Sequence, residues 1–276
     1  MTEPHPLILE ARELNAGYGA TTIVHGANVV VPPGKITVIL GANACGKSTL
    51  LKTFVRVLKP LTGSVVLDGR DITQLPSKRL ARQLGLLPQQ PIAPEGITVY
   101  DLVARGRHPH HRLFQTRAPE DDAIIADALA ATGVTELAER AVDELSGGQR
   151  QRVWIAMALA QRTEVLLLDE PTTFLDVAHQ YDVLDLLTDL NRERGTTIVM
   201  VLHDVNIAAR YADHLIAMQQ GRIVAAGAPG EVVTEATMSE VYGMTSRVIP
   251  DPVSGAPLVL PVGRHHIHTT GGIHAR

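Results

Sequence analysis

Short apolar runs recur along the chain, and stretches of helical spacing separate them. The runs Ile36–Leu40, Val165–Leu168 and Thr197–Leu202 have the length of buried strands, and each ends directly before Gly, Asp or His. Between the last two runs, Ala178–Asn191 has the pattern of a helix. Such alternation is typical of a mostly parallel sheet with helices packed on it. The pattern therefore predicts an α/β fold.

Other segments extend this prediction. A helix is expected after Gly41 and before Pro60, with an apolar face made of Leu50, Leu51, Phe54, Val57 and Leu58. Further expected elements are a strand at Ser64–Leu67, a short helix at Pro76–Leu84 and a hairpin around Gln219–Gly221.

Between about residues 91 and 161 the pattern is helical. Its expected helices are Thr98–Arg107, Glu120–Thr132 and Gly147–Gln161. We interpret this stretch as a helical insertion in the α/β core. Beyond Met244 the chain is rich in Pro and Gly and ends in a His-containing tail, so residues 246–276 are predicted to form a C-terminal extension.

The composition excludes several classes of protein. The chain has 276 residues, of which 45% are apolar and 20% charged, with a net charge of −4 and one Cys. These values argue against disorder, a disulfide scaffold and nucleic acid as the main partner. No apolar run approaches the ~18 residues of a spanning helix, and no signal peptide is visible. We expect a soluble, cytoplasmic protein.

One motif predicts a phosphate-binding loop. The pattern G-x-x-x-x-G-K-[ST] is matched by Gly41, Ala42, Asn43, Ala44, Cys45, Gly46, Lys47, Ser48 and Thr49. Backbone amides of such a loop and the following helix N-terminus attract phosphate. Lys47 is expected to reach the β- and γ-phosphates, and Ser48 to bind Mg²⁺. The alternative, a Gly-rich turn that matches by coincidence, is disfavoured because a strand precedes the loop and a helix follows it.

An acidic pair follows the apolar run Val165–Leu168. Asp169 is predicted to emerge at the carboxyl end of the strand, where ligands of open α/β sheets bind. There Asp169 would hold Mg²⁺ and Glu170 would orient or deprotonate an attacking water. Without the phosphate loop, a surface Asp-Glu at a strand end would be an equal interpretation.

The pentapeptide Leu145–Gln149 precedes the third helix of the insertion. Ser146 is a good N-cap, and Gln149 stands at the capping-box position. Gly147 and Gly148 expose backbone amides, so this segment is either a well-capped helix start or a second anion-binding helix terminus.

This LSGGQ pentapeptide resembles the signature of the ATP-binding-cassette (ABC) transporter ATPases, and further motifs follow in the family's order over roughly residues 7–245. Tyr18 matches the aromatic residue that stacks on adenine, and Gln89, rather than Gln90, matches the Gln near Mg²⁺ and the attacking water. Asp176 matches the loop that touches the opposite subunit, and His203 matches the His on the γ-phosphate. From the residues alone, Tyr18 could instead pack on the sheet and His203 could be a satisfied strand-end histidine.

The resemblance implies a P-loop NTPase (RecA-like) core with a mostly parallel sheet, an N-terminal antiparallel β portion and a helical subdomain insertion. It implies ATP and Mg²⁺ as cofactors and a homodimer of cassettes. In such a dimer, each ATP would lie between one phosphate loop and the partner's Ser146–Gln149. It also implies two transmembrane permease subunits, indirectly a substrate-binding protein, no nucleic acid, and a peripheral location on the cytoplasmic face of the membrane.

The phosphate loop departs from the family pattern at Ala44, and Ala42 stands where the family often has Pro. Ala44 replaces the usual Gly, and its Cβ disfavours positive φ, so we expect an adjusted backbone in a competent loop. The neighbouring Cys45 lies near a helix N-terminus and Lys47. We therefore expect a lowered thiol pKa and inactivation by alkylation.

The cargo is indicated only by kinship. Stretches similar to the iron(III)–siderophore, haem and cobalamin importers are Gly96–Val99, Gly106–Pro109, Thr172–Asp176 with His179 and Gln180, and His203–Asn206. Pro250–Gly255 resembles the ends of ferric-siderophore and ferric-citrate ATPases. We favour iron(III)–siderophore import, with cobalamin, haem or zinc as alternatives. A cassette ATPase outside transport, of the Fe–S assembly type, is a further alternative. The histidines at 108–111 and 265–274 are interpreted as solvated loop and tail, because metal-ligand spacing is lacking.

Overall fold

The computed structural model describes residues 7–111 and 119–263. Within these residues the strands form a four-stranded sheet in the order β2-β1-β4-β5, a six-stranded sheet in the order β10-β9-β3-β8-β7-β6 and a two-stranded sheet, β11-β12. The strands are β1 Leu9–Tyr18, β2 Thr21–Val31, β3 Ile36–Gly41, β4 Thr62–Leu67, β5 Arg70–Asp71, β6 Leu84–Leu87, β7 Val165–Asp169, β8 Thr197–Val201, β9 His214–Gln219, β10 Arg222–Gly227, β11 Ser246–Pro250 and β12 Pro257–Pro261.

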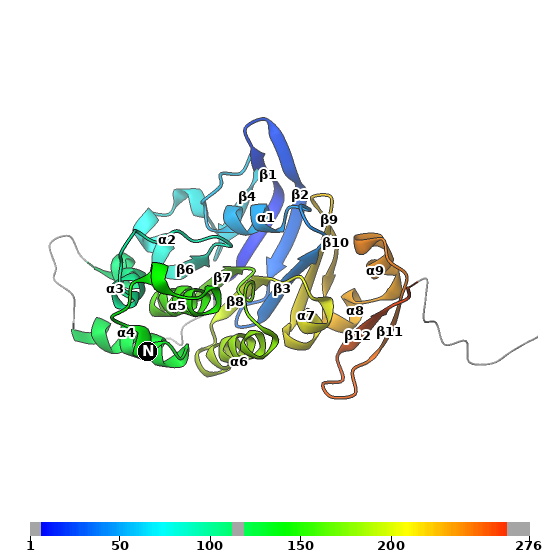
Figure 1. The fold of residues 1–276 in the computed structure, drawn as a ribbon. Coiled ribbons are helices and arrows are strands. Elements are labelled where there is room, and N and C mark those ends of the chain that lie inside the picture. The colour runs from blue at the N-terminus through cyan, green and yellow to red at the C-terminus, as the bar shows by residue number, and fades with distance from the viewer. Residues whose placement is uncertain (1–6, 112–118, 264–276) are drawn as a thin grey trace, which may run out of the picture.

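The helices surround the six-stranded sheet and fill one end of the molecule (Figure 1). The α-helices are α1 Lys47–Phe54, α2 Ser77–Gln83, α3 Val99–Ala104, α4 Pro119–Ala131, α5 Gly147–Ala160, α6 Val177–Arg194, α7 Val205–Tyr211, α8 Pro229–Val232 and α9 Glu235–Tyr242. Short 3₁₀ helices are η1 Ile72–Gln74, η2 Arg105–His110, η3 Thr135–Leu137 and η4 Val142–Glu144.

The predicted fold class is confirmed. Strands β9, β3, β8, β7 and β6 run parallel, and β10 joins the edge as the antiparallel half of a hairpin. The sheet of β1, β2, β4 and β5 is antiparallel throughout. Helices α3, α4 and α5 lie between β6 and β7 in the chain and form the helical insertion at one end of the molecule (Figure 1).

The central strands are buried on both faces, which explains their uninterrupted apolar runs. Along β7, Leu166 and Leu168 belong to one core cluster, while Val165 and Leu167 belong to another. The first cluster includes α3, α4, α5 and α6, and the second includes α1 and the antiparallel sheet. Successive side chains of β7 therefore point into different core clusters on the two faces of the sheet.

The first helix is shorter than predicted. It ends at Phe54, and Arg56 has a positive φ of 60° that a helix cannot continue through. The amides of Val57 and Leu58 turn back to the Lys52 carbonyl at 3.0 and 3.1 Å. The apolar spacing at Val57 and Leu58 thus continues after the helix has ended.

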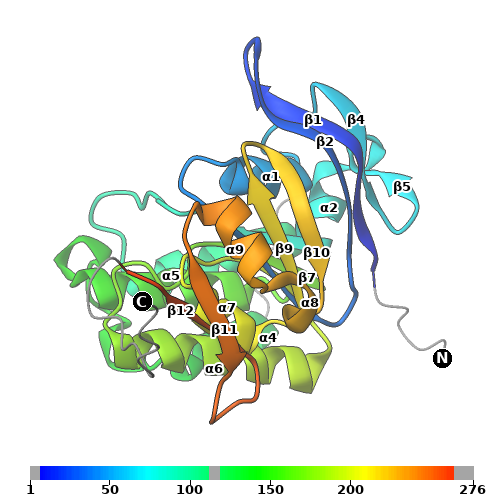
Figure 2. The same ribbon diagram turned by 90° about the vertical axis from the view of Figure 1, so that its right-hand side faces the viewer.

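The segment after Met244 contains a hairpin that the sequence did not predict. Strands β11 and β12 pair in antiparallel register from Ser246 with Pro261 to Pro250 with Pro257. The hairpin packs on α7, where Asn206 donates to the Val259 carbonyl (3.1 Å) and accepts from the Val259 amide (2.7 Å). Figure 2 shows it lying across α7 beside α9. The tail histidines of residues 265–274 lie outside the described residues.

Within residues 7–111 and 119–263, the helices are all too short or too polar to cross a bilayer.

Candidate functional site: a nucleotide site at the strand ends

Four parallel strands bring the predicted residues to one edge of the sheet. β3 ends at Gly41 and opens the phosphate loop, and β7 ends at Asp169. Register pairs Leu87 with Leu168 and Asp169 with Val201, so the carboxyl ends of β6, β7 and β8 are aligned. Gln89, Glu170 and His203 follow these ends by one or two residues. The sheet topology therefore assembles residues that are far apart in the chain.

The phosphate loop connects β3 to α1 in a tight turn. Gly46 is the N-cap of α1 with φ 104°, and Lys47 is the first helical residue. A Cβ at Gly41 would lie 2.3 Å from the Met218 carbonyl oxygen, which explains the glycine there. Lys47 is 5% exposed, and its Nζ donates to the Gly41 and Ala42 carbonyls, both at 2.9 Å. The ammonium group is thus held inside the loop, where a phosphate would lie.

Ala44 does not adjust the loop backbone, contrary to the prediction. Its φ is 61°, the left-handed conformation that a glycine would adopt more easily. The fold therefore imposes this conformation on Ala44 at a cost of about 1 kcal/mol. Strain of this kind persists where surrounding structure fixes the backbone.

The expected lowering of the Cys45 thiol pKa is wrong. The residue is 6% exposed, and burial raises the pKa of its thiol although Lys47 and two backbone amides act in the opposite direction. Gly221 donates its amide to the Cys45 carbonyl at 2.9 Å, so the turn between β9 and β10 braces the loop from behind. Cys45 is a packed residue rather than a reactive thiol.

Asp169 and Ser48 form the part of the site suited to a hard cation. Ser48 Oγ donates to Asp169 Oδ1 at 2.9 Å. Among the described residues, Asp169 Oδ2 is buried and has no hydrogen-bond partner. Burial also raises the pKa of this carboxyl group, which the Ser48 hydrogen bond only partly offsets. A hydroxyl and a carboxylate with one unpaired oxygen suit Mg²⁺ in a phosphate site, so these two residues fit the ion.

Glu170 is held by three neighbours. His203 Nε2 lies 2.7 Å from Oε1, while Gln89 Nε2 and Thr173 Oγ1 donate to Oε2 at 2.7 and 3.2 Å. Burial raises the pKa of Glu170, but hydrogen bonds from His203 and Gln89 outweigh it, so the pKa lies below its usual value. Its φ of 56° is positive, a backbone strain typical of functional positions.

The pentapeptide Leu145–Gln149 begins α5 with both halves of a capping box. Gln149 donates its amide to Ser146 Oγ (3.3 Å), and the Ser146 amide donates to Gln149 Oε1 (3.1 Å). A Cβ at Gly147 would meet the Phe174 Cβ at 3.6 Å, so this helix start packs against the loop that follows Glu170. Glycines here leave the backbone amides accessible.

Two predicted residues lie at exposed positions outside the cluster around Glu170. Tyr18 is the last residue of β1 and is 50% exposed, so it does not pack into the core. Asp176 is the N-cap of α6 and accepts from the His179 amide at 2.9 Å. Hydrogen bonds from the His179 backbone and ring lower the pKa of Asp176. Both side chains are available to a ligand or a second subunit.

Sequence reasoning missed Thr173 and Gln151. Thr173 contacts Glu170, and Gln151 donates to the Pro171 carbonyl at 2.8 Å, which ties α5 to the loop after β7. Pro171, directly after Glu170, is a turn signal in the sequence, and the turn brings the Thr173 amide to 3.2 Å from the Glu170 carbonyl. Gln151 offers no such signal, because its partner lies twenty residues further along the chain.

Known proteins share the sequence and the fold of this chain. A sequence profile of the ABC transporter family matches residues 24–173. The achromobactin transport ATP-binding protein CbrD of Dickeya dadantii is 54% identical over 256 residues, covering 93% of this chain and 95% of that protein. The ferric enterobactin transport ATP-binding protein FepC of Escherichia coli is 53% identical over 256 residues, covering 93% and 94%.

A solved structure shows the same fold. The dimeric bacterial ABC transporter cassette MJ0796 superposes with a TM-score of 0.73 at 27% identity, covering 80% of this chain and 98% of that chain. The chain therefore belongs to the ABC transporter family. Within that family it is an ATP-binding subunit, an ATPase coupled to transport.

Proposed function

We propose that this chain hydrolyses ATP to energise the import of iron(III)–siderophore complexes. The observation that carries the hydrolytic part is the pair of carboxylates at the end of β7, with Ser48 on Asp169 and both Gln89 and His203 on Glu170. The cargo is supported by the two relatives above 50% identity, which are named for achromobactin and ferric enterobactin transport.

Glu170 acts as the general base in the proposed reaction. It accepts a proton from water as the water oxygen attacks the γ-phosphorus, and the bond to the β–γ bridging oxygen breaks to leave ADP and phosphate. At least one of the three hydrogen bonds to Glu170 must break during this step, because the attacking water needs one carboxylate oxygen. His203, with a side chain that is 48% exposed, is free to turn from Glu170 toward the γ-phosphate.

The remaining loop residues bind and orient ATP. Lys47 exchanges its two carbonyl partners for β- and γ-phosphate oxygens, and amides of residues 42–49 surround the phosphates. Tyr18 stacks on the adenine. Mg²⁺, held by Ser48, Asp169 and Gln89, would neutralise charge on the β- and γ-phosphates.

The chain is proposed to act as a homodimer of cassettes. Ser146–Gln149 of one copy covers the ATP in the other copy's phosphate loop, since the Gly147 and Gly148 amides at this helix N-terminus attract an anion. Asp176 lies at the contact between the copies. Two transmembrane permease subunits dock on the dimer at the cytoplasmic face of the membrane, and a substrate-binding protein acts indirectly.

We assign the ATP-binding domain to residues 7–245, the helical insertion to about 91–161 and a C-terminal extension to 246–276.

An uptake assay tests the cargo. Cells lacking this chain and cells complemented with it are given ferric siderophore, haem, cobalamin or zinc, each labelled on the metal. We expect complementation to restore ferric-siderophore uptake, with Glu170→Gln as the inactive control. Restoration of another cargo alone would replace the siderophore assignment by one of the less supported alternatives.

Co-purification tests the transport role itself. A stable complex with a polytopic membrane protein from solubilised membranes supports it. Consistent recovery with soluble partners alone would instead favour a cassette ATPase of the Fe–S assembly type.

A further inference from the structure

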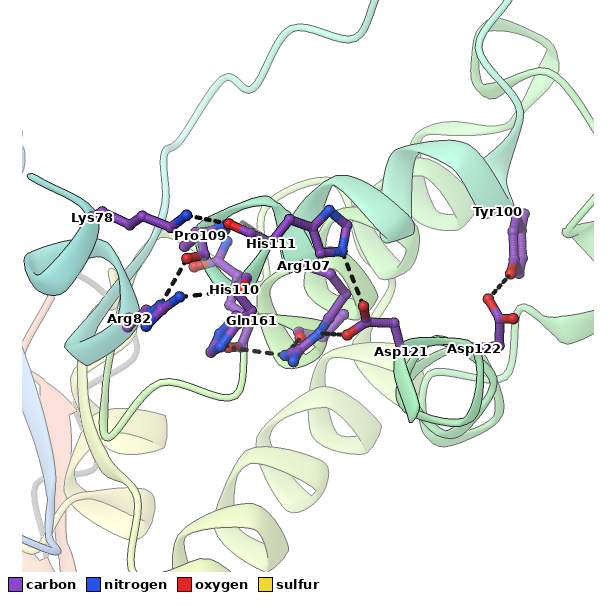
Figure 3. A network of polar contacts seen from close by, with 11 residues as sticks. Lys78, Arg82, Tyr100, Arg107, Pro109, His110, His111, Asp121, Asp122 and Gln161 are labelled. Atoms are coloured by element: carbon purple, nitrogen blue, oxygen red, sulfur yellow. Dashed lines mark hydrogen bonds and ion pairs between the residues drawn. The ribbon is translucent and has the colours of Figure 1, made fainter. Parts of the chain in front are cut away.

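Residues 105–111, which we call the bracket, lie between two parts of the molecule that are distant in sequence. The bracket comprises η2 and His111, and it follows α3 in the helical insertion. Figure 3 shows its polar contacts on one side with α2, and on the other side with α4 and the end of α5. The prediction that its histidines lie in a solvated loop is wrong for His110 and His111, which are only partly exposed and contact Gln161 and Asp121. The proposed function gives this stretch no role.

The bracket holds the C-terminal end of α5. Arg107 Nη1 donates to the carbonyls of Ala160 (2.8 Å) and Gln161 (3.5 Å), and His110 Nε2 donates to the Gln161 carbonyl at 2.8 Å. A cation at this end also interacts favourably with the helix dipole. A Cβ at Gly106 would lie 2.4 Å from the Met157 carbonyl oxygen, so the bracket backbone packs directly on the helix.

A buried ion pair fixes Arg107 in this position. Its Nε lies 2.7 Å from Asp121 Oδ1, and the two side chains are only 9% and 6% exposed. Asp121 Oδ2 lies 3.0 Å from His111 Nε2, so one carboxylate of α4 orients both Arg107 and His111. Buried pairs of this kind contribute geometry more than net stability.

The other side of the bracket is held by α2. Arg82 donates from Nε to the Pro109 carbonyl at 2.8 Å and from Nη2 to the His110 carbonyl at 3.2 Å, and Lys78 Nζ donates to the His111 carbonyl. These three donors occupy three successive carbonyls (Figure 3). The contact is exposed and contains no buried charge.

Helix α2 is in turn attached to the end of α1. Arg56 Nη1 donates to the Ile72 and Leu75 carbonyls at 2.8 and 2.7 Å, and its Nη2 donates to Ser77 Oγ at 2.8 Å. Since α1 begins with Lys47, a continuous set of contacts runs from the phosphate loop through α1, α2 and the bracket to α5. At the far end of α5 lies Ser146.

We propose that the bracket positions the α5 helix and so couples the chain's own phosphate loop to its Ser146–Gln149 segment. The proposal rests on the proposed function, in which that segment acts on the partner's ATP. Helix α5 has 14 residues, about 21 Å at 1.5 Å per residue. A small rotation at its clamped end therefore displaces Ser146 at the other end.

The exposed contact with α2 allows a test without burying a charge. In the Lys78→Ala/Arg82→Ala variant, ATP binding to the full chain should stay within about twofold of wild type, because the phosphate loop is untouched. The kcat for ATP hydrolysis should fall about three- to tenfold, with hydrolysis requiring a higher protein concentration. The matched control is Arg79→Ala on the same helix: Arg79 is exposed and has no polar partner within the described residues.

A double-mutant cycle separates positioning from general damage. If the bracket acts through α5, Lys78→Ala/Arg82→Ala should cause little further loss of kcat in a Ser146→Ala background. In a Tyr18→Ala background, where the contact with adenine is lost instead, the two fold-losses in kcat should multiply. The proposal is overturned if Lys78→Ala/Arg82→Ala has the same kcat as wild type. It is also overturned if the fold-losses in kcat caused by Lys78→Ala/Arg82→Ala and by Ser146→Ala multiply when the variants are combined. The proposal is likewise overturned if the variant loses ATP affinity by as large a factor as it loses kcat. A drop in its unfolding midpoint large enough to explain the lower kcat would overturn it as well.

The wild-type protein distinguishes failure of the coupling from failure of the proposed function. If its hydrolysis does not depend on protein concentration, the shared site between two copies is wrong. If hydrolysis does depend on concentration but ignores the bracket variants, only the coupling is wrong.

Discussion

Two aspartates in this molecule are used in opposite ways. Asp251, at the end of β11, accepts from Arg210 Nη2 (2.5 Å), the Val253 amide (2.9 Å) and Ser254 Oγ (2.8 Å). Asp169, at the end of β7, accepts only from Ser48, and its second oxygen is buried without a partner in the described part of the chain. Both oxygens of Asp251 have hydrogen-bond donors within the protein, whereas one oxygen of Asp169 can still bind a ligand.

The pKa values of Asp251 and Asp169 change in opposite directions. Arg210 and the turn hydrogen bonds lower the pKa of Asp251, whereas burial raises the pKa of Asp169. A carboxylate buried without compensation is costly to the fold, so its presence at the strand ends indicates a ligand that supplies the missing partner. A saturated carboxylate indicates an architectural role.

The largest effect is expected from Glu170→Gln. The amide cannot accept the proton of the attacking water, so kcat should fall by about a hundredfold or more while ATP binding persists. The variant should accumulate as an ATP-bound dimer in size-exclusion chromatography. Robust hydrolysis by the variant would refute the role of Glu170 as the base.

Asp169→Asn tests the strand-end cluster, where one carboxylate oxygen has no partner among the described residues. We expect ATP hydrolysis at saturating Mg²⁺ to fall by about tenfold or more, because the anionic ligand is lost. The unfolding midpoint without nucleotide should not fall, since a buried charge with an unpaired oxygen is removed. Thermal unfolding and steady-state ATPase assays on the same preparation check both parts; a large loss of stability would show that Asp169 serves the fold.

The sequence predicted which side chains meet at the strand ends, because each part of this cluster is local in the chain. A phosphate loop, an acidic pair and a capped helix each occupy a few consecutive residues, and parallel strands necessarily bring their ends together. The contacts of Gln89 and His203 with Glu170 then follow from strand order.

The prediction failed where distant packing decides the local structure. Pro250, Pro257 and Pro261 favoured a loop, yet all three lie at the ends of paired strands, where a missing amide is tolerated. Ala44 keeps a glycine-like φ because the loop around it is fixed on both sides. The burial that raises the pKa of Cys45 is likewise a property of the folded core.

Asp251→Asn makes the same chemical change in the saturated region. Because the folded-state pKa of Asp251 is lowered, its contribution is fully present above the usual value of about 3.9 and is lost as the pH falls through the lowered pKa. The variant should therefore melt a few degrees lower at neutral pH, and the difference should narrow in acid. ATPase activity at 25 °C should stay near wild type; a large loss there would give the hairpin a part in catalysis.

The smallest effect is expected from Thr173→Val. This variant tests whether Glu170 resembles the fully hydrogen-bonded Asp251 or the incompletely hydrogen-bonded Asp169. The hydroxyl of Thr173 donates to Glu170 and helps to lower its pKa, so the variant should raise that pKa and shift the acidic limb of the kcat profile to higher pH. Thr172→Val is the matched control, because the Thr172 hydroxyl accepts from Gln180 and does not contact Glu170. Coincident acidic limbs for wild type and Thr173→Val would mean that another group limits the reaction in acid. A shift in Thr173→Val alone would show that Glu170 is partly compensated by the fold and still free to take a proton.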